Sequence, residues 1–344
     1  MSSPILFAMG NPLLDMQVTG GEKLLEKYDL KANDAILAED KHNPIYDEVV
    51  KDYKVTYLAG GAAQNAARGA AYVLPEGSVV YTGCVGDDEL AEQLKSANKR
   101  EGLQEAYLVK KGEKTGACAV VITGHNRSLV TTLRAAEKFE KSWLDTPEIS
   151  KLIDGAKAYY VEGFFLTHGT ESTVELAQKA STASKTFILN LSAPFIPQFF
   201  KVQLEKVLPY TDIIICNESE AAAYAGAVGL PNVDDIPAIA RALATSPKSN
   251  PSRPRLAVIT QGPDSTIVVS GDAPDAPKVF PVHALGDADI VDTNGAGDAF
   301  AGGFVGAFVS GKSLDACVEA GHKMGSMSVQ LVGPQYKWPK VQVL

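Results

Sequence analysis

The chain has 344 residues, of which 45% are hydrophobic and 21% are charged, and its formal net charge is −9. This balance is typical of a globular protein with one large domain and room for a smaller appendage, and it indicates neither a disordered nor a fibrous chain. An acidic chain without a Lys/Arg cluster is a poor partner for a nucleic-acid polymer or an anionic membrane. Any phosphate group must therefore be bound locally, by backbone amides and a few cationic side chains.

The cysteines and the first residues indicate where the protein works. The four cysteines are widely separated and form no CxxC pair, which argues against a zinc site or a disulfide framework. The N-terminal stretch lacks the basic region of a signal peptide, and the longest uncharged apolar run, Ala299 to Val309, is too short to span a bilayer. We expect a cytoplasmic monomer, with entry into the nucleus left open.

Short Val/Ile/Leu-rich runs alternate along the chain with segments of helical length. Most runs do not alternate with polar residues, as is typical of parallel strands buried on both faces. Strands that alternate with helices predict an α/β layered fold with right-handed crossovers. The predicted strands are Ile5–Met9, Val79–Cys84, Ala117–Thr123, Ala158–Val161, Thr186–Leu191, Asp212–Cys216, Leu256–Thr260 and Thr266–Ser270. The predicted helices are Ala62–Leu74, Glu89–Arg100, Glu171–Ser181, Gln198–Leu208 and Ile236–Ala244.

Two stretches depart from this pattern. Residues 15–59 and 115–136 are polar, β-prone and poorly helical, and we expect them to pair as a small β-rich lid. The Pro/Ser-rich, basic segment 245–255 is predicted to be an exposed loop. The large α/β domain comprises the remaining ranges, 1–14, 60–114 and 137–344.

The strongest chemical signal is the nine-residue run DTNGAGDAF over residues 292–300, which is followed by the apolar segment AGGFVGAFV. The run predicts a strand end, a Gly-rich turn and the first turn of a buried helix. Free amides of Gly295, Ala296 and Gly297 at the start of that helix form an anion site. An isolated GxGD match is more often a plain turn capped by its Asp, here Asp298.

In its strand, turn and helix context, the run resembles the C-terminal signature of the ribokinase-like (PfkB) family, and Asn294 gives it the form found in members that phosphorylate adenosine. The resemblance implies a three-layer α/β fold with a central, mostly parallel sheet flanked by helices and a small β-rich lid. It also implies that Asp298 is the catalytic base, while the amides of residues 295–297 hold the transferring phosphoryl group. A carboxylate in the first helical turn is expected to have a low pKa, because the helix dipole favours its charge.

Two N-terminal motifs extend the resemblance. The first motif is GNPLLD, residues 10–15. From local sequence alone, a turn-capping role explains Asn11 and Asp15 about as well as a binding role does. In the family, the Asp binds the ribose 2′ and 3′ hydroxyls and the Asn lies beside the nucleoside. In GGAAQN, residues 60–65, the resemblance implies that Gly61 gives room to the sugar and that Asn65 bonds a ribose hydroxyl. Many relatives carry a hydroxyl residue after the two glycines, where this chain has alanines.

The middle of the chain supplies the expected nucleotide and metal contacts. Asn217 and Glu220 in NESE match an Asn-x-x-Glu element in which the Glu orients Mg²⁺ through water, although a helix N-cap box is the plain alternative. Asn190 in NLSAPF is expected on the nucleotide side. In GFFLT, Phe165 is expected to stack on adenine and Phe164 to be core.

Further contacts are implied by position within the family pattern. Arg127 in HNRSLVTTL matches the lid arginine, whose guanidinium reaches the transferring phosphoryl oxygens when the lid is closed. Thr260 and Gly262 follow a predicted strand and line the ATP phosphates. His322 is expected near the ATP adenosine, with a core position nearly as good an explanation.

The implied activity is ATP-dependent phosphorylation of the adenosine 5′-hydroxyl, which gives AMP and ADP in purine salvage, with ATP as co-substrate and Mg²⁺ at the phosphates. Two alternatives stay open: another nucleoside or sugar kinase of the same fold, and a nucleoside-binding protein without turnover. An intact Asp298 and anion site argue against the second. A Rossmann dehydrogenase is a weaker alternative still, because no GxGxxG follows the first strand and no acidic residue is placed for an NAD ribose.

Overall fold

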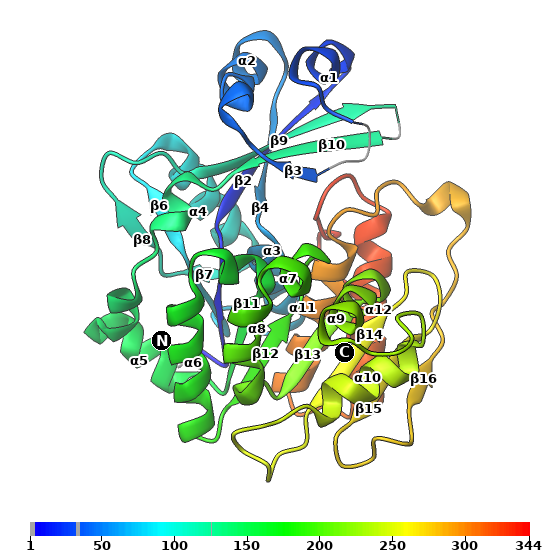
Figure 1. Cartoon of the computed structure of the whole chain (residues 1–344). Coiled ribbons are helices and arrows are strands. Elements are labelled where there is room, and N and C mark those ends of the chain that lie inside the picture. The colour runs from blue at the N-terminus through cyan, green and yellow to red at the C-terminus, as the bar shows by residue number, and fades with distance from the viewer. Residues whose placement is uncertain (1–3, 32–34, 125) are drawn as a thin grey trace.

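A twisted sheet divides the larger part of the chain into three layers (Figure 1). The computed structural model describes residues 4–31, 35–124 and 126–344. Over these residues the sheet has nine strands in the order β16-β15-β14-β13-β12-β11-β1-β5-β7, and the pairs are parallel except at β14–β15 and β15–β16. The strands are β1 (Leu6–Met9), β5 (Val79–Thr82), β7 (Gln104–Glu105), β11 (Ala158–Glu162), β12 (Thr186–Asn190), β13 (Ile213–Asn217), β14 (Leu256–Thr260), β15 (Thr266–Ser270) and β16 (Lys278–Phe280).

Central strands send alternate side chains into two helical layers, because successive side chains in a strand point to opposite faces. In β1, Leu6 and Ala8 belong to one core cluster, while Phe7 and Met9 belong to the other. The helices of the first layer are α3 (Ala62–Val73), α4 (Glu89–Glu101), α11 (Ala296–Val309) and α12 (Leu314–Val329). The helices of the second layer are α5 (Pro147–Gly155), α6 (Thr170–Thr182), α7 (Phe195–Phe199), α8 (Lys201–Val207), α9 (Glu218–Val228) and α10 (Ile236–Thr245). The predicted three-layer α/β fold is confirmed, with the helix predicted over 198–208 divided between α7 and α8.

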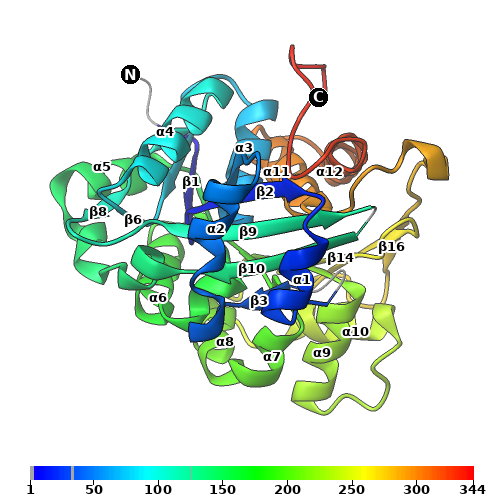
Figure 2. The same cartoon turned by 90° about the horizontal axis from the view of Figure 1, so that it is seen from above.

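The segments expected to form a small sheet do pair with each other. Over the described residues this sheet has five strands in the order β3-β10-β9-β2-β4, and it lies across the carboxyl ends of the main strands (Figures 1 and 2). Residues 32–34 and 125 of the predicted lid, and 1–3 of the large domain, lie outside the described residues. The strands are β2 (Leu13–Thr19), β3 (Ala35–Leu37), β4 (Thr56–Gly60), β9 (Gly116–Thr123) and β10 (Asn126–Thr132). Strands β6 (Cys84–Gly86) and β8 (Leu108–Lys110) form a separate pair.

The prediction that these lid segments are poorly helical is wrong. Helices α1 (Glu22–Tyr28) and α2 (Ile45–Asp52) pack on one face of the small sheet, where Met16 and Val18 of β2 meet their apolar side chains. The alternate residues of β2, Asp15 and Gln17, are buried polar side chains that belong to the other face. The small sheet therefore has an apolar outer face and a mixed inner face, on which the polar side chains of β2 lie beside Leu58, Val120 and Leu129.

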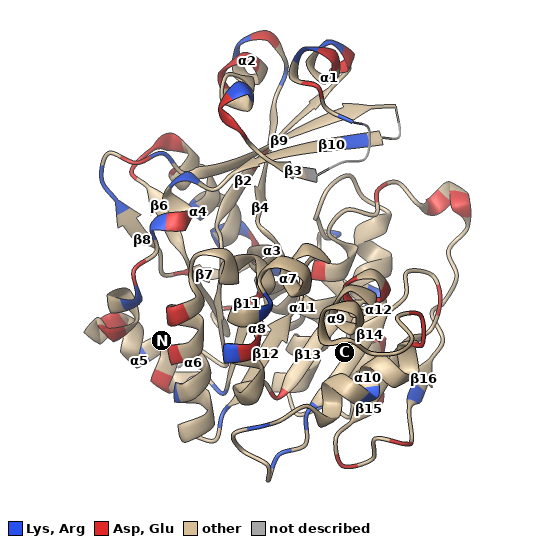
Figure 3. Ribbon diagram, viewed as in Figure 1, with Lys and Arg blue, Asp and Glu red and all other residues tan. Residues whose placement is uncertain are grey.

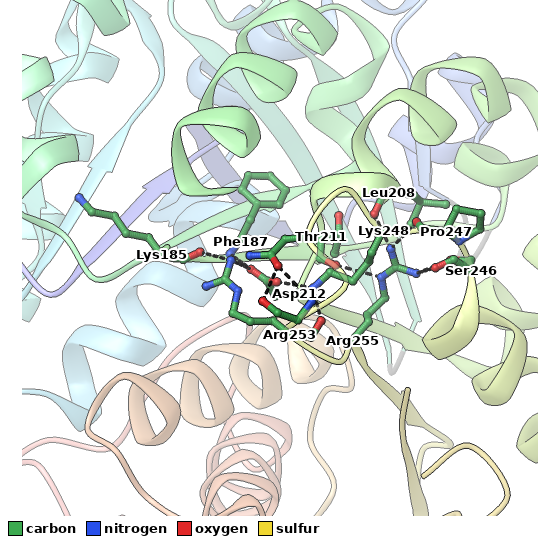
Figure 4. A network of polar contacts seen from close by, with 12 residues as sticks. Lys185, Phe187, Leu208, Thr211, Asp212, Ser246, Pro247, Lys248, Arg253 and Arg255 are labelled. Carbon is green, nitrogen blue, oxygen red and sulfur yellow. Dashed lines mark hydrogen bonds and ion pairs between the residues drawn. The ribbon is translucent and has the colours of Figure 1, made fainter. Parts of the chain in front are cut away.

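The basic segment 245–255 is a mostly exposed loop, as predicted, but three of its basic side chains are bonded to neighbouring elements. Lys248 donates to Asp212 Oδ1 at 2.5 Å and Arg253 donates to Asp212 Oδ2 at 2.9 Å (Figure 4). Arg255 is 0% exposed, and its guanidinium donates to the carbonyl oxygens of Leu208, Thr211, Leu243, Ser246 and Pro247 (Figure 4). The basic side chains of segment 245–255 thus hold this loop against the residues that precede β13.

We expect Arg255→Met to lower the free energy of unfolding by about 3 kcal/mol or more, because it leaves several buried carbonyls without a donor. Turnover per folded molecule should not change, since these contacts lie at the opposite edge of the sheet from the predicted site. Thermal and urea unfolding test this. The control is Arg241→Ala on α10, whose side chain is 51% exposed and whose loss should cost less than about 0.5 kcal/mol. Equal stability of the two variants would contradict the expectation.

Two surface observations bear on the predicted partners. Lys/Arg and Asp/Glu are interspersed over the helices and loops of the face in Figure 3. Among the helices that the structure describes, none has the length and apolar character needed to cross a bilayer.

Candidate active site

The carboxyl ends of the parallel strands bring several predicted polar residues, together with Glu162, to one edge of the main sheet. Glu162 and Asn190 are register partners at the ends of β11 and β12. Asn217 and Thr260 are partners at the ends of β13 and β14, and Asn11 follows β1. In open α/β sheets, ligands bind at this edge.

The start of α11 lies at the same edge and has the form predicted for an anion site. The helix begins at Ala296, and no side chain caps it. Its N-cap residue Gly295 has φ 78°, which glycine adopts without steric cost. Ala296 N is 3.3 Å from the Thr293 carbonyl, whereas Gly297, in the first turn, is exposed. First-turn amides have no partner within the helix, so they are available to an anion.

Asp298, also in the first turn of α11, is hydrogen-bonded to a residue of the distant helix α3. Its Oδ2 accepts a hydrogen bond from Asn65 Nδ2 at 3.0 Å. The two residues are separated by 233 positions. Asn65 was expected to bond a ribose hydroxyl, and in this structure its amide contacts the expected base.

The pKa of Asp298 is raised, whereas its position in the first helical turn predicts that it is lowered. Burial raises it to about 7, against the lowering effects of the Asn65 hydrogen bond and the Arg68 charge. Burial, with the Asp298 charge as a smaller cause, also raises the pKa of Asp15 and of Glu220 to about 7. The helix dipole favours the carboxylate, but desolvation has the larger effect.

This gives an expected pH dependence. A raised pKa means that Asp298 is protonated below about pH 7 and cannot accept a proton there, so kcat/KM should fall as the pH drops through 7. The observed midpoint belongs to the interacting carboxyls together. Initial rates between pH 5.5 and 9 at low adenosine would measure it. A flat profile down to pH 5.5 would show that Asp298 stays ionised throughout.

Asp15 and the two adjacent glycines form a tightly packed corner where the lid strands meet α3. Asp15 on β2 is 6% exposed. A Cβ on Gly60 would overlap the Asp15 carboxylate. A Cβ on Gly61, whose φ is 87°, would collide with the Asn11 carbonyl. The Gly-Gly motif is therefore explained by close approach of Asp15 and Asn11, and not only by room for a sugar.

The pair of phenylalanines differs from the expectation. Phe165 is 1% exposed, and its ring packs against Phe139 at 5.4 Å and His168 at 4.9 Å between centroids. Buried in this way, Phe165 has no open face for adenine, and its expected stacking role is corrected. Phe164 is partly exposed and lies 5.9 Å from the Phe195 ring. Sequence alone could not separate two adjacent rings in a short 3₁₀ helix.

Asn11 and His168 form a second polar contact at this edge, with the His168 side chain half-buried. His168 Nε2 lies 2.9 Å from Asn11 Oδ1. Burial lowers the pKa of His168 to about 4. The ring is neutral at pH 7, so its Nε2–H donates to Asn11 and fixes that side chain next to β1.

Arg127 lies on β10 and reaches the DTNGAGD loop. It forms an ion pair with Asp292 at 3.0 Å, and the side chains are 11% and 4% exposed. Asp292 Oδ1 also accepts from Asn294 N at 3.0 Å, and Oδ2 accepts from Gly333 N at 2.6 Å. The loop that leads into the anion site is thus held by the lid on one side and by the C-terminal segment on the other.

Asn217 and Glu220 form the N-cap box that was the plain alternative for this motif. Asn217 Oδ1 accepts from Glu220 N at 2.8 Å, and Glu220 Oε2 accepts from Asn217 N at 3.0 Å. Glu220 is 5% exposed. Within the described ranges, no group of three or more His, Cys, Asp or Glu side chains is arranged to hold a metal ion.

The other expected nucleotide contacts are spread more widely. Asn190 donates to Tyr160 Oη at 3.3 Å. Thr260 donates to the Cys216 carbonyl at 3.4 Å, and Gly262 follows in an exposed turn with φ 54°. His322 is 8% exposed and lies 2.8 Å from Thr266 Oγ1. This burial supports the core position for the histidine.

A family model described as pfkB family carbohydrate kinase matches residues 22–341. The chain belongs to the PfkB family. Its sequence is 64% identical to an adenosine kinase of Schizophyllum commune, over all of both chains, and 45% identical to one of Schizosaccharomyces pombe, over 99% of each. Its fold is similar to a crystal structure of Anopheles gambiae adenosine kinase in complex with P1,P4-di(adenosine-5) tetraphosphate, with TM-score 0.90, 38% identity and 96% of each chain covered. It is also similar to Schistosoma mansoni adenosine kinase in complex with 2-fluoroadenosine, with TM-score 0.90, 32% identity and 98% of each chain covered. The predicted family, fold and likeness to its adenosine-phosphorylating members are confirmed.

Two buried charged residues of this PfkB chain were missed by sequence reasoning. Arg68 on α3 is 2% exposed and donates twice to Glu101, at 2.7 and 2.8 Å. Glu162 at the end of β11 is 2% exposed, and burial, with the Asp298 charge next, holds its pKa well above the ordinary value. Burial was not visible in either case, although a Glu that ends a strand at the carboxyl edge is a usable signal.

Proposed function

We propose that this chain is an adenosine kinase, which transfers the terminal phosphoryl group of ATP to the 5′-hydroxyl of adenosine and gives ADP and AMP. The observation that carries the proposal is the contact between Asn65 and Asp298 at the uncapped start of α11. A carboxylate and the first-turn amides of a helix stand side by side there, as an acceptor for a hydroxyl proton and a site for a phosphoryl group. The 64% identity to a relative named adenosine kinase supports the choice of substrate.

In this mechanism Asp298 accepts the proton of the 5′-hydroxyl. Phosphoryl transfer passes through a loose transition state, so the hydroxyl proton is lost late and orientation of the hydroxyl counts for more than base strength. The amides of residues 295–297 bind the transferring phosphoryl group. Asp15 accepts both ribose hydroxyls, since two carboxylate oxygens match two donors. Asn11 and Phe164 lie on the nucleoside side in this proposal.

Mg²⁺ fits the residues at this edge. The Asp298 charge raises the pKa of both Glu162 and Glu220, beyond the main effect of burial, and such a surplus of negative charge favours a hard, oxygen-binding cation. Glu220, and Asn217 through it, would hold the ion through water, and the ion would neutralise ATP phosphates. Thr260 and Gly262 bind phosphate oxygens, with Asn190 nearby.

The small sheet acts as a lid in this proposal. Its inner face carries Asp15 and Arg127, and the ion pair of Arg127 with Asp292 already links the lid to the phosphoryl site. Closure brings the ribose acceptor and the guanidinium to the same substrate. Residues 15–59 and 115–136 therefore serve as a lid on the large domain.

The deciding experiment measures ATP consumption with a panel of nucleosides and sugars. We expect ribose to have at least about a hundredfold lower kcat/KM than adenosine, because burial of the base is worth a few kcal/mol and each 1.4 kcal/mol is a factor of ten. 5′-Deoxyadenosine should inhibit and accept no phosphate. Phosphorylation of ribose as efficient as that of adenosine would favour a sugar kinase of the same fold instead. Binding of adenosine without turnover would favour a non-catalytic nucleoside-binding protein.

A further inference from the structure

Arg68 occupies a position where an unpaired charge would be costly, and it is held by several partners. It lies on α3, is 2% exposed, and its Nε and Nη2 donate to the two oxygens of Glu101. Nη1 donates to the Ala59 carbonyl of lid strand β4 at 2.8 Å and to Asn65 Oδ1 at 3.1 Å. The guanidinium lies 5.9 Å from the ring centroid of Tyr336.

These contacts fix which way the Asn65 amide points. A guanidinium can only donate, so it can be met only by the oxygen of the amide. With Oδ1 turned to Arg68, Nδ2 must face away, and it donates to Asp298 Oδ2 at 3.0 Å. The Asn65 backbone is also held, because its carbonyl accepts from Tyr336 Oη at 3.0 Å. The orientation of the Asp298 carboxylate thus depends on a residue that does not contact it.

We propose that Arg68 is a positioning residue for phosphoryl transfer, which fixes the Asn65 side chain and through it the Asp298 carboxylate, and which is itself fixed by Glu101. The inference rests on the proposed function, in which Asp298 receives the proton. Because Arg68 also bonds the Ala59 carbonyl of β4, the same guanidinium connects a lid strand to the base.

The charge of Arg68, like its hydrogen bonds, prepares Asp298 to accept a proton. The groups that face Asp298 and Asp15 come from several elements, and they are Arg68, Cys118, Arg127, Tyr160, Glu162, Glu220 and Tyr336. Most of these are acids or neutral groups. Arg68 lowers the pKa of both carboxyls, so it favours the ionised form that the reaction needs.

The test compares Arg68→Met and Arg68→Lys with the wild-type enzyme. For Arg68→Met we expect kcat to fall about tenfold to a hundredfold, because the base loses its orientation. The acid limb, which is the fall of kcat/KM towards low pH, should also move up by about half a pH unit to one unit, because the cation that lowers the pKa of Asp298 is gone. Arg68→Lys keeps the charge but cannot make all four contacts. Its acid limb should stay at the wild-type position while kcat falls at least about threefold.

Two further variants separate positioning from folding. Arg255→Met removes another buried arginine, remote from the site, and should lower thermal stability without moving kcat or the acid limb. Glu101→Gln removes the negative charge that offsets Arg68. The Arg68 cation should then lower the pKa of Asp298 further, so the acid limb of kcat/KM should move to lower pH. Adenosine dissociation constants over the same pH range report on Asp15 and separate its titration from that of Asp298.

The outcomes are distinct. If Arg68→Met matches Arg255→Met, with lower stability but unchanged kcat and acid limb, the inference is overturned while the kinase proposal stands. If Arg68→Met does not fold, an acid limb in Glu101→Gln that coincides with the wild type overturns it equally. If Asp298→Asn is fully active, the proposed function loses its base, whatever Arg68 does.

Discussion

Asp298→Asn should lower kcat by at least about a hundredfold, because the amide cannot accept the hydroxyl proton. The shape of the side chain is kept, and Asn65 can still donate to the remaining oxygen. Adenosine binding, which in this proposal depends on Asp15, Asn11 and Phe164, should change only severalfold. Single-turnover rates and calorimetric adenosine titrations would measure the two effects separately.

A matched control for Asp298 exists on the next helix. Asp315 also lies in the first turn of its helix, α12, but is exposed. Asp315→Asn should leave kcat unchanged. If Asp298→Asn retained turnover close to that of the wild type, Asp298 would have no part in proton transfer.

Arg127→Ala should lower kcat by about a hundredfold while adenosine affinity changes little. The guanidinium is held by Asp292 at 3.0 Å, beside the loop that leads to the anion site, and removing a preorganised cation from a developing negative charge typically costs two to three powers of ten. Asp292 keeps two backbone N–H donors, so the loop should remain folded. Arg127→Lys should recover part of the rate, because it restores charge without the planar donor set.

Hydrogen exchange gives a second readout of the lid. Adenosine should protect amides in 15–31, 35–59 and 115–136 more than ATP alone does, because closure removes them from water. Exchange in the large sheet provides the internal reference. Equal exchange with and without adenosine, together with a fully active Arg127→Ala, would rule out a lid that carries a catalytic arginine.

The main sheet could be predicted because its strands are buried on both faces and therefore lack polar alternation. The runs at β12, β13 and β14 were found within one residue of their observed bounds. The lid helices were missed for the opposite reason. α2 has only eight residues, IYDEVVKD, and its buried Ile45, Tyr46 and Val49 acquire a partner only when the distant strand β9 is in place.

Site residues divide along the same line. The DTNGAGD run and the Gly-Gly motif are contiguous, so sequence placed Asp298 and Gly61 correctly at element boundaries. Arg68 could not be found, because its partners Ala59, Glu101 and Asn65 lie on three elements and its burial is a tertiary property. The pKa of Asp298 was predicted in the wrong direction for the same reason, since the burial that raises it is also a tertiary property.

The C-terminal segment bears on when the site is complete during synthesis. Gly333 binds Asp292, Pro334 packs against Gly295, and Tyr336 binds Asn65, which precedes it by 271 residues. Lys340 and Val341 fasten the segment to α3, near the C-terminus in Figure 2. A ribosome-bound nascent chain can assemble most of the main sheet before these residues emerge from the exit tunnel. The phosphoryl site then lacks one of its walls, so catalytic competence is acquired only after residues 333–341 are outside the ribosome.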